Sequence, residues 1–184
     1  MNAVAAFITG HSVRGCTGLS KVQRDFQRRS IIPLEKWLPH NFPYHETFPF
    51  PEPSLLSASF NNVVHYFRSR LPAFQKQHQE TVCQVFSSYD AVILLAGSCG
   101  LELLCNLDLP QPLRRRLHVF AYGPVSRSLP EVASMLTIQG TGDLLSRSFH
   151  PTADHRFPCP HTGYLKAPET LHWFNRFYQS VTVS

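Results

Sequence analysis

The sequence lacks any apolar run of the roughly 18 residues that a membrane-spanning helix requires. The segment Met1 to Ile8 also lacks the basic residues that open a secretory signal peptide. Charged residues are scarce, at 16% of 184, whereas 43% of the residues are hydrophobic. We therefore expect no membrane span, a cytoplasmic location and a single globular domain over residues 1–184, long enough to bury a sizeable core.

Paired cysteines are absent as well. The five thiols are Cys16, Cys83, Cys99, Cys105 and Cys159, an odd number with no C-x-x-C spacing. This usage excludes a disulfide framework and is typical of a reducing compartment with mostly buried thiols.

A continuous basic stripe is also missing, although the net charge is +5. The basic residues form small knots, such as Arg28-Arg29 and Arg114-Arg115-Arg116, with no interleaved aromatics and no nucleic-acid-binding motif. The sequence therefore predicts a basic solvated face and no nucleic-acid partner.

What is present is an alternation of short apolar runs and helical patterns. Strands are predicted at residues 3–9, 31–34, 91–97, 118–122 and 135–139, and helices at 19–29, 54–71, 82–89, 99–107 and from 168 onward. Residues 38–54 and 146–162, rich in proline, predict irregular loops. This alternation favours an α/β three-layer sandwich with a mostly parallel sheet of about six strands.

The run after Asp90 ends in A-G-S-C-G, which sets a hydroxyl beside a thiol. A sharp strand–nucleophile–helix turn needs small residues two before and two after the nucleophile, where the two backbones come close. Ser98 at the apex has Ala96 and Gly100 at these positions, whereas Cys99 would have Leu101 two residues after it. The spacing therefore favours Ser98 as a nucleophile, with Cys99 supplying a backbone N–H.

A serine nucleophile needs a general base, and the base needs an acid that orients it. Asp143 lies in G-T-G-D just after the predicted strand at 135–139, and His161 lies in P-H-T-G-Y-L before the last helix. The carboxyl ends of parallel strands share one edge of the sheet, so both are expected near Ser98. The chain order is then Ser98, Asp143, His161.

These motifs together resemble a small α/β-hydrolase-fold protein over most of the chain. The loop Gly10-His11-Ser12 is similar to the one that donates the other oxyanion N–H, from His11, and Ala96 to Gly100 resembles the nucleophile elbow, with alanine at its first position. The resemblance implies a reduced fold without the first antiparallel strands or a separate cap. It also implies a Ser98-His161-Asp143 triad with the N–H groups of His11 and Cys99 as the oxyanion hole.

Two other kinds of site, a dinucleotide-binding loop and a metal site, are less consistent with the sequence. The glycines at 10, 15 and 18 fit neither G-x-G-x-x-G nor T-G-x-x-x-G-x-G, which disfavours dinucleotide binding. His150, His155, Cys159 and His161 could ligate a metal, but their spacing matches no zinc pattern and the loop cannot present them on a helix face. No metal and no cofactor is predicted, and His150 and His155 are expected to be ordinary loop residues.

Three further polar residues are given structural roles. Asp108, a rival acid, is expected to be a turn residue, Glu102 a solvated or capping group, and Tyr164 a packing residue.

The leading hypothesis is a serine hydrolase that cleaves a small-molecule carboxylic ester or thioester, whose acyl part the abundant Phe and Leu favour as apolar. The alternative is a catalytically inactive α/β-hydrolase-fold protein that serves as a binding or scaffold module, because fold does not guarantee chemistry. The sequence specifies neither the substrate nor the oligomeric state.

Overall fold

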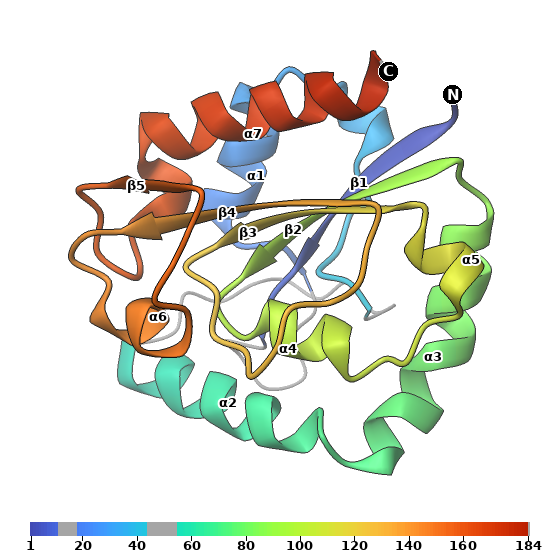
Figure 1. Cartoon of the computed structure of the whole chain (residues 1–184), viewed down its shortest axis with the longest axis horizontal. Helices are drawn as coiled ribbons and strands as arrows, with labels where there is room; N and C mark the ends of the chain where they lie inside the picture. Colours follow the sequence, from blue (N-terminus) through green and yellow to red (C-terminus); the bar gives the residue numbers. More distant parts are fainter. Residues whose placement is uncertain (11–17, 44–54, 184) are drawn as a thin grey trace.

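The computed structural model describes residues 1–10, 18–43 and 55–183. Its centre is a single parallel sheet in the order β1-β2-β3-β4-β5, which lies between the helices in Figure 1. The strands are β1 (Ala3–Ile8), β2 (Ala91–Gly97), β3 (Leu117–Tyr122), β4 (Ser134–Gly140) and β5 (His155–Phe157). The carboxyl ends of all five strands therefore lie along one edge.

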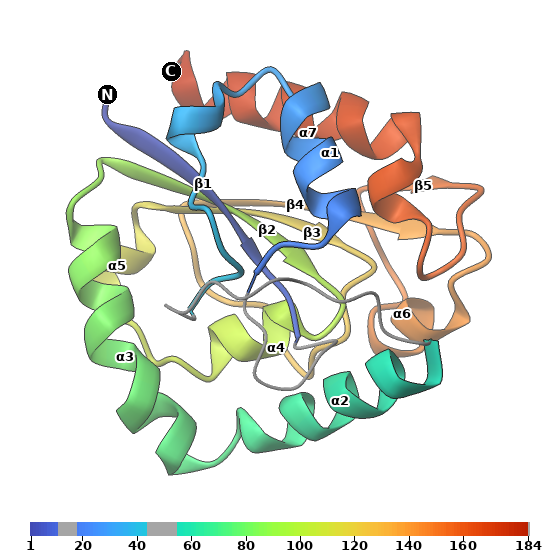
Figure 2. The same cartoon turned by 180° about the vertical axis from the view of Figure 1, so that it is seen from behind.

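Helices cover both faces of the sheet, as the two opposite views in Figures 1 and 2 show. One face carries α1 (Lys21–Arg29) and α7 (Pro168–Thr182), and the other carries α3 (Pro72–Ser87), α4 (Gly100–Cys105) and α5 (Gln111–Arg114). The remaining elements are α2 (Leu55–Arg68), α6 (Leu144–Phe149) and the 3-10 turns η1 (Leu34–Lys36) and η2 (Tyr164–Lys166). The predicted α/β class with helices on both faces is confirmed.

The alternation of side chains along each strand divides the core in two. In β2, Val92 and Leu94 face α3 and α4, while Ile93 and Leu95 face α1 and α7. Because both faces are covered, β2 is buried along its whole length. This explains why it reads as a continuous apolar run rather than as alternating apolar and polar residues.

The connection from β1 to β2 visits both faces of the sheet. After β1 the chain forms α1 on one face and returns beside the outer edge of β1. There, Ala5 forms a parallel β-bridge with Trp37, and Ile8 forms one with Phe42. It then crosses through α3 on the opposite face to reach β2 on the inner side of β1. Crossover connections between parallel strands are right-handed. The first connection leads from β1 to its outer side and the second leads back to its inner side, so their helices lie on opposite faces of the sheet. The direction in which strands are added therefore reverses at β1, and open parallel sheets bind ligands at the carboxyl ends of strands beside such a reversal.

Several expected elements differ. The described residues form five named strands, so the expectation of about six is not confirmed. Residues 31–34 are not a strand but lead into η1, because Pro33 has no N–H to donate to a ladder. The stretch 146–162, expected to be irregular, overlaps α6 and contains β5.

Helix α2 runs across the carboxyl-end edge of the sheet, below α4 and α6 in Figure 1. Its Asn62 side chain lies against the end of β1, since a Cβ on Gly10 would come within 2.4 Å of Asn62 Oδ1. Among the described segments, no helix is both long and apolar enough to cross a membrane.

Candidate active site

The turn after β2 has a strained backbone. Ser98 has φ of 50°, a value that non-glycine residues rarely adopt. Its backbone is held on both sides, since Ser98 N–H donates to the Tyr122 carbonyl at 3.3 Å and the Ser98 carbonyl accepts from Val125 N–H at 2.9 Å. Strain of this kind persists only when the surroundings enforce it, and it projects the half-exposed Ser98 side chain out of the sheet edge.

The small residues of this turn have a direct steric cause. A Cβ on Gly100 would lie 1.8 Å from the backbone oxygen of Ile8, at the end of the neighbouring strand β1. A Cβ on Gly97 would lie 2.4 Å from the ring of Tyr122 on β3. The start of α4 therefore packs directly on β1, the close approach that the A-G-S-C-G spacing predicts.

Three residues from distant parts of the chain meet at this turn. Ser98 Oγ lies 3.1 Å from His161 Nε2, and His161 Nδ1 lies 2.9 Å from Asp143 Oδ2. The carboxylate accepts hydrogen bonds, so Nδ1 carries the proton of the neutral ring and Nε2 is left to accept from the Ser98 hydroxyl. The Asp143 side chain is fully buried, while that of His161 is 29% exposed.

Asp143 is fixed at both carboxylate oxygens. It is the N-cap of α6, where Oδ1 accepts from Ser146 N–H at 3.0 Å. Oδ2 accepts from the Tyr164 hydroxyl at 2.7 Å in addition to its contact with His161. The Asp143 carboxylate is therefore shielded from solvent and held in one orientation by its hydrogen bonds.

Cys99, next to Ser98, is the N-cap of α4, and its thiol is buried. Burial raises the pKa of the Cys99 thiol to about 12. A thiolate is the reactive form of cysteine, so this side chain is poorly suited to be a nucleophile. The other expected oxyanion donor, His11, lies outside the described residues.

The side chains of His150, His155 and Cys159, which lie near His161 in the sequence, each contact a different partner. His150 Nε2 is 2.9 Å from Ser126 Oγ, and the His155 ring stacks on Trp173 with centroids 3.4 Å apart. The Cys159 thiol donates to the Pro160 carbonyl at 3.3 Å. Within the described part of the chain, no three His, Cys, Asp or Glu side chains converge as a metal site would need.

Asp108 follows the carboxyl end of α4, whereas Ser98 precedes its amino end. It adopts φ of 47° after α4 and lines a cavity of about 300 Å³ with residues from the amino end of β3. This placement fits the turn residue that its sequence context predicts.

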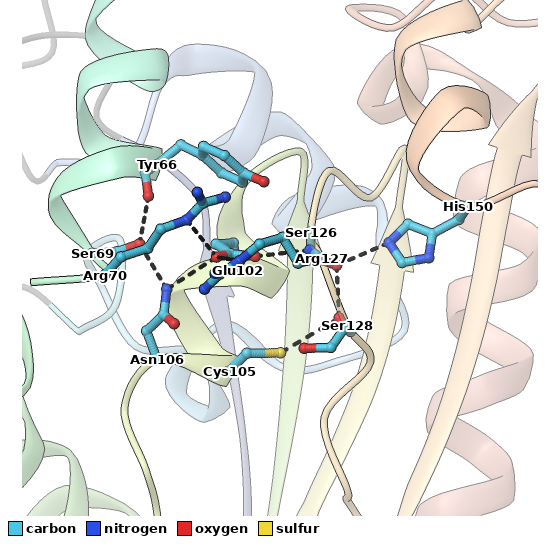
Figure 3. A network of polar contacts seen from close by, with 10 residues as sticks. All are labelled: Tyr66, Ser69, Arg70, Glu102, Cys105, Asn106, Ser126, Arg127, Ser128 and His150. Carbon is cyan, nitrogen blue, oxygen red and sulfur yellow. Dashed lines mark hydrogen bonds and ion pairs between the residues drawn. The ribbon is translucent and has the colours of Figure 1, made fainter.

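Glu102, expected to be a solvated or capping group, is instead 1% exposed. Figure 3 shows the network around it. Glu102 Oε1 contacts Arg70 Nε at 3.0 Å and Arg127 Nε at 2.9 Å, and Oε2 accepts from Arg127 N–H at 2.9 Å. Burial acts to raise the pKa of Glu102, but the Arg127 N–H and the Arg70 guanidinium, with Asn106, hold it below its ordinary value. The expectation was wrong because Glu102 points inward, toward these partners.

The sequence reasoning thus missed two polar partners. The signal for Glu102 is its position inside an apolar run, Leu101 to Leu104, where a lone carboxylate must be paired. Tyr164 was expected only to pack, and it does pack, against Tyr122 and Phe157, but its hydroxyl also reaches Asp143. Nothing in the local sequence indicates that second contact.

No protein-family model matches the chain, and no curated protein matches it. The fold and the site define a class only: an α/β protein with an all-parallel sheet between helices, compatible with the α/β-hydrolase fold.

Proposed function

We propose that the protein is a serine hydrolase of reduced α/β-hydrolase fold that cleaves a small-molecule carboxylic ester or thioester. The observation that carries the proposal is the hydrogen-bonded series from Ser98 through His161 to Asp143. It lies at a strained turn on the carboxyl edge of a parallel sheet, next to β1, whose other side carries the bridges to Trp37 and Phe42. Parallel sheets bind ligands at the carboxyl ends of strands where the direction of strand addition reverses.

In the proposed reaction, Ser98 Oγ attacks the carbonyl carbon and its proton passes to His161 Nε2. The Asp143 carboxylate keeps Nδ1–H in place and stabilises the imidazolium that forms. His161 then gives the proton to the leaving alcohol or thiol, which leaves an acyl group on Ser98. A water molecule, deprotonated by His161, attacks this acyl group and releases the acid and the free serine.

Backbone N–H groups would stabilise the oxyanion of both tetrahedral intermediates. The Cys99 N–H is one proposed donor and the His11 N–H, predicted from the sequence, is the other. A single such donor contributes ~3 kcal/mol to transition-state stabilisation.

The surroundings of the acid favour an apolar acyl or alkyl part in the substrate. Leu144 and Leu145 follow Asp143 directly and are 73% and 48% exposed. Exposed leucines that follow the proposed acid in the chain offer apolar surface for a ligand to cover.

The test is labelling with a fluorophosphonate probe, read by intact mass, together with hydrolysis of a series of p-nitrophenyl esters. We expect one covalent adduct on the wild type and none on Ser98→Ala. We expect ester hydrolysis to fall by roughly 10³-fold or more in Ser98→Ala and His161→Ala, since triad members act as a unit.

Ser148→Ala is the matched control, because Ser148 is an exposed serine on α6 that bonds only the Leu145 carbonyl in the described structure. It should label like the wild type. An unlabelled wild type, under conditions that label a control esterase, would refute the hydrolase proposal and favour the non-catalytic binding protein. An adduct that persists in Ser98→Ala would move the nucleophile elsewhere.

A further inference from the structure

The hydroxyl of Tyr164 has a fixed direction of donation. Tyr164 lies in η2, three residues after His161, and is 2% exposed. Its hydroxyl oxygen accepts a hydrogen bond from Gly140 N–H at 2.7 Å. An amide nitrogen can only donate, so the single hydroxyl proton is free to point at Asp143 Oδ2, also at 2.7 Å.

That proton reaches the same oxygen that holds His161. Oδ2 of Asp143 accepts from both the Tyr164 hydroxyl and His161 Nδ1, whereas Oδ1 accepts from Ser146 N–H. Each donor withdraws negative charge from the oxygen that it contacts. Tyr164 therefore competes with the imidazole for the charge of one carboxylate oxygen.

The fold makes room for this contact at Gly123. Gly123 has φ of +53°, and a Cβ there would lie 2.5 Å from Tyr164 Cε2 and 2.9 Å from Asp143 Oδ2. Only glycine fits both the backbone conformation and the space. Burial, and then the hydrogen bond with Asp143, raise the pKa of Tyr164, so the hydroxyl stays protonated and remains a donor at any working pH.

We propose that Tyr164 is a positioning residue of the acid–base pair, which fixes the Asp143 carboxylate and reduces the negative charge that Oδ2 presents to His161. The inference rests on the proposed hydrolase function. Tyr164 acts through Asp143 and touches no substrate.

Among the described residues, the thiol of Cys159 is a further ionisable group that interacts with the charge of Asp143. Its pKa is raised, first by burial and then by the charges of Asp143 and Glu169, so it is neutral at pH 7. In the described structure, the side chains that donate to Asp143 Oδ2 are then the Tyr164 hydroxyl and the His161 ring N–H.

The test is Tyr164→Phe, which removes only the hydroxyl. Without that donor, Oδ2 keeps more charge and stabilises the imidazolium, so protonated His161 persists to higher pH. We expect the acidic limb of the kcat/KM profile for a p-nitrophenyl ester to move to higher pH. We also expect kcat to fall about tenfold with KM nearly unchanged, since orientation is lost and substrate contacts are not.

Tyr178→Phe is the matched control, because Tyr178 is half-buried in α7 against the same core. Its pH profile should match that of the wild type. An unmoved acidic limb in Tyr164→Phe, or an equal displacement in Tyr178→Phe, would overturn the role of Tyr164.

A second variant guards against poor folding of Tyr164→Phe. Site-specific 3-fluorotyrosine at position 164 keeps the hydroxyl and makes it a stronger donor, so the limb should move the opposite way, to lower pH. Displacement in the same direction as Tyr164→Phe would contradict the inference.

An NMR titration of the His161 ring separates this inference from the proposed function, because it needs no substrate. The midpoint should lie at higher pH in Tyr164→Phe than in the wild type. If the wild type is not labelled by fluorophosphonate, the hydrolase proposal fails. Equal midpoints in the two proteins would instead defeat the inference about Tyr164.

Discussion

Ser98 and Cys99 are neighbours on one turn, yet their side chains have opposite surroundings. Ser98 reaches the half-exposed imidazole of His161, whereas the Cys99 thiol is 3% exposed and lies under Gly10, whose Cβ would come within 2.5 Å of the sulfur. The choice between the hydroxyl and the thiol is thus made by burial as well as by the spacing of small residues.

We predict that Cys99 resists alkylation in the folded protein. With a pKa of about 12, roughly one thiol in ten thousand is ionised at pH 8. Iodoacetamide at pH 8, followed by peptide mass spectrometry, should modify Cys99 only after denaturation. The half-buried Cys83 serves as the internal control and should react first. Rapid modification of Cys99 in the native state would show an accessible thiolate and reopen its candidacy as the nucleophile.

The sequence was sufficient to predict that Ser98, Asp143 and His161 lie close together, because each follows a strand end or precedes the last helix. It was insufficient for Tyr164 and Glu102. Their partners come from other elements, and only the packed structure brings those partners into reach. A tyrosine that only packs and a tyrosine that also donates to a buried carboxylate have the same local sequence.

At the scale of elements, the Glu102 network joins four segments. Arg70 follows α2, Glu102 lies in α4, and Arg127 lies in the loop after β3. Ser126, in the same loop, contacts His150 at the end of α6. The Arg70 guanidinium also stacks on Tyr66, 4.1 Å from the ring centroid. The network therefore ties α2 and α6 to α4, the helix that follows the Ser98 turn (Figure 3).

We predict that Glu102→Gln lowers the free energy of unfolding by ~2–3 kcal/mol at pH 7. The change removes the one carboxylate that Arg70 and Arg127 share, and the loss stays below the largest values for buried pairs because Arg127 is 57% exposed and regains water. Urea denaturation followed by circular dichroism measures it. Glu80→Gln, an exposed carboxylate in α3, is the control and should change stability by less than ~0.5 kcal/mol. A loss no larger than that of the control would mean that the network does not stabilise the fold.

Helices and strands were predicted well where the apolar residues follow a single pattern along the element. β2 and α7 carry uninterrupted apolar patterns and lie close to their expected bounds. The strand predicted at residues 31–34 was wrong. Its two isoleucines are typical of a strand, but the following proline has no N–H to donate to a neighbouring strand. α6 and β5 have only six and three residues, which is too short for a periodic pattern of apolar residues to be recognised.

At the scale of the whole molecule, one histidine links stability to acidity. His65 lies in α2, and burial, followed by the charges of His78 and Arg68, lowers its pKa to about 4. The unfolded chain binds a proton at this residue near pH 6.5, where the folded protein does not. His65 therefore leaves stability intact above about pH 6.5 and reduces it as the pH falls toward 4.

We predict that the free energy of unfolding falls by up to ~3 kcal/mol between pH 7 and pH 4 on account of His65. Urea denaturation across this range should give a flatter pH dependence for His65→Gln than for the wild type. His172→Gln, an exposed histidine in α7, should leave the dependence unchanged. Parallel curves for the wild type and His65→Gln would rule out this linkage.

The segment that contains Leu38 and Phe42 lies along the outer edge of β1, where it affects strand pairing between copies of the protein. Leu38 N–H donates to the Ala5 carbonyl and Phe42 N–H to the Phe7 carbonyl, so backbone acceptors on the outer side of β1 are already occupied. The opposite edge ends in β5, which is three residues long. An exposed, long and flat edge strand is what recruits a strand from another molecule in aggregation and domain swapping. With one flank occupied and the other truncated, this sheet offers a poor template for intermolecular strand addition.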